Sequence, residues 1–401
     1  MTLTSLFATR AGRMKASEIR ELLKLLNRPG ILSFAGGIPD PALFPVEAFR
    51  EATDRALADG AADMSLQYST SEGNPALRAW IAEYMGSIGV PCEADNILIT
   101  SGSQQALDYL GKLFLSPGDT ALVGWPTYLG ALGAFNAYEP RYDRLDPADN
   151  RAPEAVAAEA TAAGGAVKFL YVTPDFSNPT GVTLSADERR ALIAQAEALD
   201  AAILEDSAYY ALRYSGEDVP PILALEIAEK GSIEEARTIY CGSFSKTLAP
   251  GLRVGWVCAA MPVIRQLVLM KQAGDLHSAT LNQALVADVA RRAMGGHIPR
   301  LRAHYGARRD AMLAALKAYM PKGVSWTEPE GGMFVWVTLP QGMDGAALLV
   351  RALEEENVAF VPGSAFYADG SGKNTIRLNF SSPNEAQIDE GLKRLGRLLA
   401  G

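Results

Sequence analysis

The most regular pattern in the chain is an alternation of short apolar runs with Ala-rich helical segments between about positions 97 and 260. Short apolar runs bounded by Gly, Pro or small polar residues predict buried strands, and the Ala-rich segments between them predict helices. Such alternation is typical of strand–helix–strand units that build a mainly parallel sheet. The predicted strands are residues 97–100, 121–125, 169–173, 201–204, 238–241 and 254–259, with helices at 104–115, 151–163 and 187–199.

The pattern changes after Asn282. Two helices are predicted at 282–290 and 299–319, and they are followed by strands at 333–339, 358–361 and 375–380 among further helices. A chain of 401 residues exceeds the usual size of one domain. We therefore expect a large α/β domain and a smaller α+β domain.

Composition excludes several classes of protein. A formal net charge of −9, without any Lys/Arg-rich run, argues against nucleic acid as a partner. No apolar run approaches the roughly 18 residues of a membrane span, and residues 1–24 lack an apolar signal segment, so a cytoplasmic protein is expected. The cysteines and histidines show neither disulfide nor metal-ligand spacing, and no metal site is predicted. They are Cys92, Cys241, Cys258, His277, His297 and His304.

Lys246 is the residue with the clearest chemical context. It lies among hydroxyls and glycines just after the predicted strand 238–241, and strand ends are where α/β folds place reactive groups. A nearby cation such as Arg253 would favour the neutral amine and could also bind an anion. The pair predicts a Schiff base beside a phosphate, as pyridoxal phosphate requires. A solvated loop lysine is the alternative. A P-loop is rejected, because Ser245 and Tyr240 stand where that motif needs glycines.

The segment 243–256 resembles the lysine signature of the class I/II, fold-type I pyridoxal-phosphate aminotransferases, and most closely the 2-aminoadipate/kynurenine branch. Further matches follow in family order from residues 33–37 to Arg377, so that the resemblance covers nearly the whole chain. It implies an α/β fold with a mainly parallel seven-stranded sheet between helices, and a homodimer. It also implies three segments: residues 1–45, packing with the small domain and the substrate site; 46–285, the large cofactor-binding domain; and 286–401, the small domain.

Ser103 and Gln104 open a predicted helix directly after a strand, where free backbone N–H groups and the helix dipole favour an anion. An ordinary N-cap is the alternative. The resemblance implies that both residues bind the cofactor phosphate together with Ser243, Ser245 and Arg253.

Asp206 ends a predicted strand, where a carboxylate could keep the pyridine nitrogen of the cofactor protonated. A helix N-cap is the alternative, and strand alternation sends its competitor Glu205 to the other face. By resemblance, Tyr209 and Asn178 bind the phenolic oxygen of the cofactor, with Asn178 also near the substrate. Tyr128 corresponds to the aromatic residue that stacks on the ring.

Arg377 is a lone cation in an apolar strand pattern, and it matches the arginine that binds the substrate α-carboxylate; an outward-facing surface arginine is the alternative. Tyr68 matches the tyrosine that reaches the phosphate in the neighbouring subunit. Asp175 and Ser207 depart from the family pattern, and the sequence explains neither.

Arg20 lies beside an apolar stripe of helical spacing, followed by the flexible Gly36 and Gly37. The resemblance implies that Arg20 meets a distal carboxylate of the substrate and that Gly36 lies close to the substrate; a solvated helix-face arginine is the alternative. We expect an aminotransferase that accepts 2-aminoadipate or glutamate, and large apolar or aromatic donors, with a 2-oxo acid such as 2-oxoglutarate. The rival functions are a β-lyase or decarboxylase on the same fold and a non-catalytic ligand-sensing domain, although the early start of the match leaves no space for a fused DNA-binding module.

Overall fold

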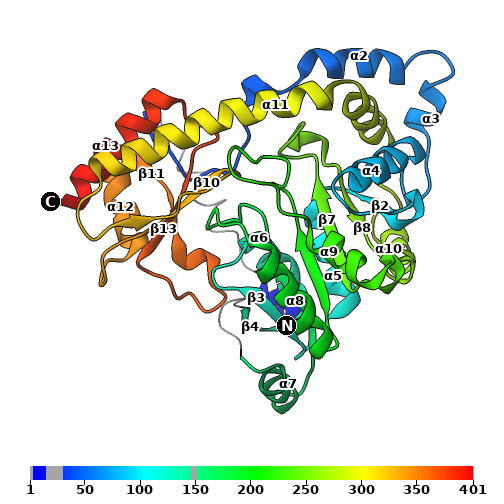
Figure 1. Cartoon of the computed structure of the whole chain (residues 1–401), viewed down its shortest axis with the longest axis horizontal. Helices are drawn as coiled ribbons and strands as arrows, with labels where there is room; N and C mark the ends of the chain where they lie inside the picture. The colour runs from blue at the N-terminus through cyan, green and yellow to red at the C-terminus, as the bar shows by residue number, and fades with distance from the viewer. Residues whose placement is uncertain (1–2, 15–29, 146–150, 401) are drawn as a thin grey trace.

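The large part of the molecule is built on a seven-stranded sheet (Figure 1). In this computed structural model, residues 3–14, 30–145 and 151–400 are described. The strand order is β2-β8-β7-β6-β5-β3-β4, and only β8 runs antiparallel to its neighbours. The strands are β2 (Ile97–Thr100), β3 (Thr120–Gly124), β4 (Arg141–Leu145), β5 (Val167–Val172), β6 (Ala202–Asp206), β7 (Thr238–Ser243) and β8 (Gly255–Cys258). The predicted mainly parallel sheet is confirmed.

Helices cover both faces of this sheet, which explains why its strands are apolar almost throughout. Neighbouring residues alternate between the two faces: Leu98 packs with α5, α6 and α10, whereas Ile97 and Ile99 pack with α4 and α9. The helices of this part are α4 (Pro75–Ser87), α5 (Ser103–Phe114), α6 (Leu129–Phe135), α7 (Pro153–Ala162), α8 (Ala186–Ala198), α9 (Ile222–Lys230) and α10 (Met261–Gly274).

The edge strand β4 is the strand of this sheet that the sequence pattern does not predict. Its residues read Arg-Tyr-Asp-Arg-Leu, and only the last is fully buried. A half-exposed edge strand needs no continuous apolar run, so its sequence resembles that of a loop.

A 40-residue helix, α11 (Thr280–Tyr319), joins the two parts of the molecule (Figure 1). The sequence predicts two helices with a break before Pro299, and this is wrong because the helix continues through the proline. A proline inside a helix removes one hydrogen bond and presses on the carbonyl four residues earlier, which here belongs to Gly295 beside Gly296. The predicted boundary between residues 285 and 286 falls inside this helix.

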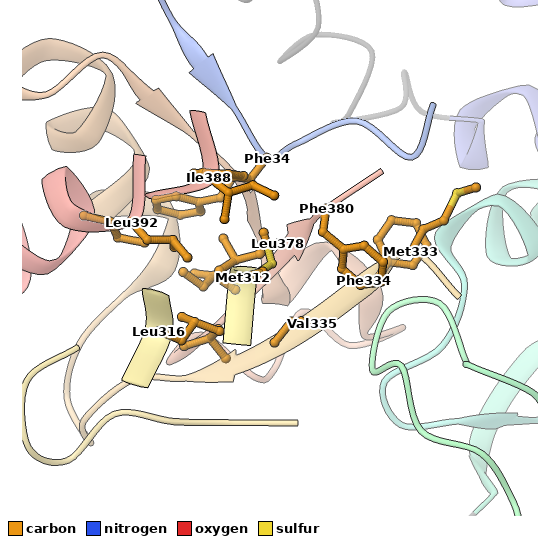
Figure 2. Packing of buried hydrophobic residues seen from close by; sticks show 14 of the residues in the cluster. Phe34, Met312, Leu316, Met333, Phe334, Val335, Leu378, Phe380, Ile388 and Leu392 are labelled. Carbon is orange, nitrogen blue, oxygen red and sulfur yellow. The ribbon is translucent and has the colours of Figure 1, made fainter. Parts of the chain in front are cut away.

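The smaller part contains an antiparallel sheet of order β12-β13-β10-β9 and a parallel pair, β1-β11. Figure 2 shows Phe34 packed beside Ile388 and Leu392 of α13, together with residues of α11 and β10. This packing supports the proposal that the N-terminal segment belongs with the small domain; the three segment boundaries stay a prediction. The elements are β1 (Leu32–Ser33), β9 (Ser325–Trp326), β10 (Phe334–Thr338), α12 (Gly345–Glu355), β11 (Val358–Ala359), β12 (Val361–Pro362), β13 (Thr375–Asn379) and α13 (Glu385–Ala400).

The remaining elements lie at the N-terminus and on the surface. α2 and α3 pack against α11. These elements include η1 (Leu3–Leu6), η2 (Thr9–Arg13), η3 (Pro41–Leu43), α2 (Val46–Ala56), α3 (Ala62–Leu66), η5 (Asn136–Tyr138) and η7 (Pro250–Leu252). Among the described residues, no helix has the length and apolarity needed to cross a membrane.

Candidate active site

A cavity of about 1020 Å³ lies between the carboxyl ends of the large-sheet strands and the small sheet. This is where ligands bind in open α/β sheets. Asp206 and Ser243 reach it from the ends of β6 and β7, and Phe334 and Arg377 reach it from β10 and β13. The cavity is lined by these predicted site residues: Ser103, Gln104, Tyr128, Asn178, Asp206, Tyr209, Ser243, Ser245, Lys246, Arg253 and Arg377.

Lys246 lies in the turn that follows β7, with its side chain on the cavity. Its Nζ donates a hydrogen bond to the Gly37 carbonyl at 2.7 Å and lies 6.0 Å from the ring centre of Tyr209. Burial, together with the positive charges of Arg377 and Arg253, lowers the pKa of Lys246 to about 8. The amine is therefore closer to its nucleophilic, neutral form at physiological pH than a surface lysine is.

Asp206 is buried at the end of β6 and is oriented by Tyr171. The Tyr171 hydroxyl donates to Oδ2 at 2.8 Å, whereas the buried Oδ1 has no hydrogen-bond partner among the described residues. Burial raises the pKa of Asp206 to about 6. Glu205 lies on the other face, as predicted, and accepts from the amides of Ile222 and Leu223 at the start of α9. Asp206 therefore does not cap this helix, and its free oxygen is available to a donor in the cavity.

Ser103 and Gln104 form the first turn of α5, and Arg253 lies against the preceding Gly102. Gln104 Nε2 donates to the Gly130 carbonyl at 2.7 Å, and the Ser245 amide donates to Ser243 Oγ at 3.1 Å. Arg253 has a left-handed backbone with φ 54°, an unusual conformation for a bulky residue. One cation, a helix N-terminus and several hydroxyls thus meet at one end of the cavity.

Tyr128, Tyr209 and Asn178 lie on the cavity as well. Burial raises the pKa of both phenols, so they are hydrogen-bonding alcohols at neutral pH. Asn178 Oδ1 accepts from Arg377 Nη1 at 2.7 Å, which links the loop after β5 to the small sheet.

Arg377 is 2% exposed, so the alternative of an outward-facing surface residue is wrong. Its Nη2 donates to the Ala35 carbonyl at 2.9 Å, and its guanidinium lies 4.2 Å from the ring centre of Phe334 and 4.9 Å from that of Phe366. Burial lowers its pKa to about 10. Within the described ranges, the hydrogen-bond partners of Arg377 are neutral oxygens rather than carboxylates, and its Nε has no partner. A buried cation of this kind favours an anionic ligand.

Gly36 and Tyr68, two of the predicted site residues, do not line the cavity. Gly36 directly precedes Gly37, which does line it. Tyr68 is 78% exposed and contacts the ring of His277 edge-on at 5.7 Å. Arg20 and its predicted helix lie outside the described residues.

Comparison with known proteins identifies the family. Residues 30–395 match the family described as aminotransferase class I and II. The chain belongs to the class I and II aminotransferases. It is 45% identical to an aromatic-amino-acid aminotransferase of Thermococcus litoralis and 44% identical to a 2-aminoadipate transaminase of Thermus thermophilus, covering 98% of this chain and 94% and 96% of those proteins. A solved kynurenine aminotransferase of Pyrococcus horikoshii, in complex with PMP, superimposes with a TM-score of 0.91 at 44% identity, covering 99% of this chain and 98% of that one.

The chain is thus a fold-type I aminotransferase, and its cofactor is pyridoxal phosphate. The residues present fit this group. The unpartnered Oδ1 of Asp206 suits the protonated ring nitrogen, and Arg253 with the N-terminus of α5 suits the phosphate. Lys246, with its lowered pKa, suits the aldehyde.

The aminotransferase site also contains residues that the sequence did not single out. Tyr171 was missed because its contact with Asp206 depends on the pairing of β5 with β6. Arg13, a half-buried residue of η2, lines the same cavity and donates to the Pro140 carbonyl at 2.8 Å. Asp175, unexplained by the sequence, forms a fully buried ion pair with Arg189 at 2.7 Å and is not on the cavity.

Proposed function

We propose that this aminotransferase moves the amino group of an L-amino acid to a 2-oxo acid such as 2-oxoglutarate, with 2-aminoadipate, glutamate and large apolar or aromatic amino acids as donors. The carrying observation is that Lys246 and Arg377 line the same cavity, and that Arg377 is a buried cation without a carboxylate partner in the described part of the chain. Relatives named for aromatic, 2-aminoadipate and kynurenine transfer support this range.

The large-sheet side of the cavity is proposed to hold the cofactor. Bound pyridoxal phosphate supplies an aldehyde that captures the amine and a ring that accepts electrons from the substrate Cα. Asp206 would accept from the ring nitrogen, Tyr128 would stack on the ring, and Tyr209 and Asn178 would bind the phenolic oxygen. The phosphate would be held by Ser103, Gln104, Ser243, Ser245 and Arg253.

Lys246 is the proposed proton carrier. When the substrate amine has displaced it, its Nζ can accept the proton from the substrate Cα. The pKa of about 8 keeps a substantial fraction of this amine neutral near pH 7.5. The Gly37 carbonyl, which accepts from Nζ at 2.7 Å, gives the freed amine a fixed partner.

Arg377 is proposed to bind the substrate α-carboxylate. Its Nη groups are fixed by Asn178 and the Ala35 carbonyl, so the guanidinium holds one orientation. A carboxylate clamped there would fix which Cα bond faces Lys246, and correct orientation is a large part of catalysis.

For the far end of the substrate, two arginines are candidates. Arg20 is proposed from the family resemblance. Arg13 is supported by its position on the cavity, and it has no ion-pair partner among the described residues. Apolar residues of α6, Leu129 and Leu132, line the same cavity and would suit apolar donors.

A panel of donors and acceptors tests the function. Transamination consumes one acceptor oxo acid for each donor, whereas a lyase or decarboxylase consumes none. Arg13→Ala and Arg20→Ala should each be compared with wild type on 2-aminoadipate and leucine. The arginine that binds the distal carboxylate should lose about 10- to 100-fold in kcat/KM on 2-aminoadipate alone. An equal loss on leucine would contradict that role.

We also propose a homodimer in which Tyr68 reaches the partner's site. Exposed Tyr68, Met64 and Leu66 lie close together in sequence, and a partner would cover them. Hybrids of a Lys246→Ala subunit with a Tyr68→Ala subunit provide the test. If Tyr68 acts across the interface, each hybrid keeps one intact site and activity returns on mixing; action within one subunit gives no recovery. The cytoplasmic location stays a prediction.

A further inference from the structure

A fully buried lysine lies behind the loop that opens α5. Lys271, near the end of α10, is 0% exposed and does not line the cavity. Its Nζ donates to Gln105 Oε1 at 2.8 Å and to the two carboxylate oxygens of Asp275 at 2.9 and 3.1 Å. A buried charge is costly unless it is paired and hydrogen-bonded, and Lys271 meets this condition through Gln105 of α5 and Asp275 just after α10.

Gln105 is the centre of the network. Its Oε1 also accepts from the Ser101 amide at 2.8 Å, and its Nε2 donates to Asp275 Oδ2 at 2.7 Å. An amide side chain can be turned either way, but a lysine can only donate and a carboxylate can only accept. Lys271 and Asp275 therefore select the one orientation in which the amide oxygen faces Ser101.

Ser101 is consequently held from both sides. Its amide bonds to Gln105, its hydroxyl lies 3.2 Å from Asp275 Oδ2, and its carbonyl accepts from Arg253 Nη2 at 3.4 Å. Gly102, with φ 82°, then completes the turn into α5. A Cβ at this glycine would lie 2.5 Å from Arg253 Nη2, so the loop and the arginine are packed closely together.

This arrangement determines which backbone N–H groups are free to donate hydrogen bonds to an anion. The Ser101 amide is already used, so the next free donors are the amides of the first turn of α5, at Ser103 and Gln104. Asp275 balances the charge of Lys271, so the pair adds no net charge behind the loop. Its influence on a phosphate must therefore come from geometry rather than from direct attraction.

We propose that Lys271, Gln105 and Asp275 form a positioning network that holds the loop from Ser101 to Gln104 in the conformation that binds the cofactor phosphate. The proposal rests on the assignment of this loop to the phosphate. A structural ion pair without influence on the loop is the alternative that the experiment must separate.

The test measures cofactor binding to apoenzyme. Lys271→Met, made together with Asp275→Asn so that no unbalanced charge is left behind the loop, removes the donor and keeps an unbranched side chain, so the dissociation constant for pyridoxal phosphate should rise at least tenfold. Pyridoxal, which lacks the phosphate, should bind the variant and the wild type within about twofold of each other. Inorganic phosphate, used as a competitor, should lose affinity in parallel with pyridoxal phosphate.

Glu226→Gln is the matched control. Glu226 is buried and accepts from the amides of Arg237 and Thr238 at the start of β7, at the opposite end of that strand from Ser243. This variant should lower the Tm of the apoenzyme and leave the dissociation constant of pyridoxal phosphate unchanged.

Two results would overturn the inference. One is an unchanged affinity of the double variant for pyridoxal phosphate; the other is an equal loss for pyridoxal, which would indicate general damage to the site. If the double variant does not fold, Gln105→Met removes the amide at the centre of the same network and is judged by the same measurements. Failure of the wild type to bind pyridoxal phosphate would instead refute the proposed function.

Discussion

The two walls of the cavity are built in different ways. The large-sheet wall, formed by Ser103, Asp206, Lys246 and Arg253, comes from strand ends and the turns that follow them within one continuous sheet. The small-sheet wall, formed by Arg377 and Phe334 together with Gly37, comes from an antiparallel sheet and from the N-terminal segment after β1, which is distant in sequence.

The difference fits the proposed division of the cavity into a cofactor side and a substrate side. On the large-sheet wall Asp206 is oriented by Tyr171 of the neighbouring strand, and Arg253 lies against Gly102 before α5. On the small-sheet wall Arg377 is oriented from both sides, by Asn178 of the large part across the cavity and by the Ala35 carbonyl of the N-terminal segment. A permanently bound cofactor suits the first arrangement, and a substrate that enters and leaves suits the second.

Lys246, which contacts both walls, should give the largest effect. Lys246→Ala removes the nucleophile and the proton carrier together, and general base catalysis alone is worth about 10²–10⁴-fold. We expect turnover to fall by about 10⁴-fold or more, while pyridoxal phosphate still binds through the large-sheet wall. Borohydride reduction of the wild type, followed by peptide mapping, should place the label on Lys246; a label on another lysine would refute the assignment.

Asp206→Ala tests the large-sheet wall. Without the carboxylate the ring nitrogen would lose the partner proposed to keep it protonated, and a positioned acid–base group contributes about 10²–10⁴-fold. We expect kcat to fall by about 10²–10⁴-fold. The factor should be similar for every amino donor, and cofactor affinity should change much less. Turnover close to that of wild type would assign Asp206 a purely structural role.

Arg377→Ala tests the small-sheet wall. Loss of a buried, hydrogen-bonded charge partner costs about 2–5 kcal/mol, so kcat/KM should fall by roughly 30- to 5,000-fold, chiefly through substrate recognition. Arg377→Lys should not restore the activity, because an ammonium lacks the planar fork and cannot meet Asn178 and the Ala35 carbonyl together. Steady-state kinetics with saturating cofactor provide the measurement, and full rescue by lysine would contradict the clamp.

The same comparison explains what the sequence could predict. Residues of the large-sheet wall follow apolar strands directly, so local pattern places Asp206 and Lys246 at a sheet edge. The strand pattern around Arg377 is compatible with an inward or an outward side chain, and only the pairing of β13 between β10 and β12 decides the matter.

Other features depend on contacts between distant segments and could not be predicted. Tyr171 supports Asp206 only because β5 lies beside β6, and Arg13 reaches the cavity only because η2 packs near η5. Conversely, Pro299 gives a strong local signal for a helix end, which the packing of α11 against both parts of the molecule overrides.

The smallest expected effect concerns the stability of the apoenzyme, and it depends on residues of both walls. The pKa of Lys246 is lowered to about 8 by burial and by one arginine from each wall, Arg377 and Arg253, whereas an unfolded lysine titrates near 10.4. Between these values the unfolded chain binds more protons, so this lysine destabilises the folded apoenzyme fully below pH 8 and progressively less as the pH rises to about 10.4.

Lys246→Met should therefore be more stable than wild type at pH 7, by about 3 kcal/mol at most, and the difference should shrink above pH 8. Denaturant unfolding of both apoenzymes measures the difference, with Lys112→Met at an exposed position of α5 as the control substitution. A difference between Lys246→Met and wild type that does not change from pH 7 to 10 would show that the two walls do not depress the pKa of this amine.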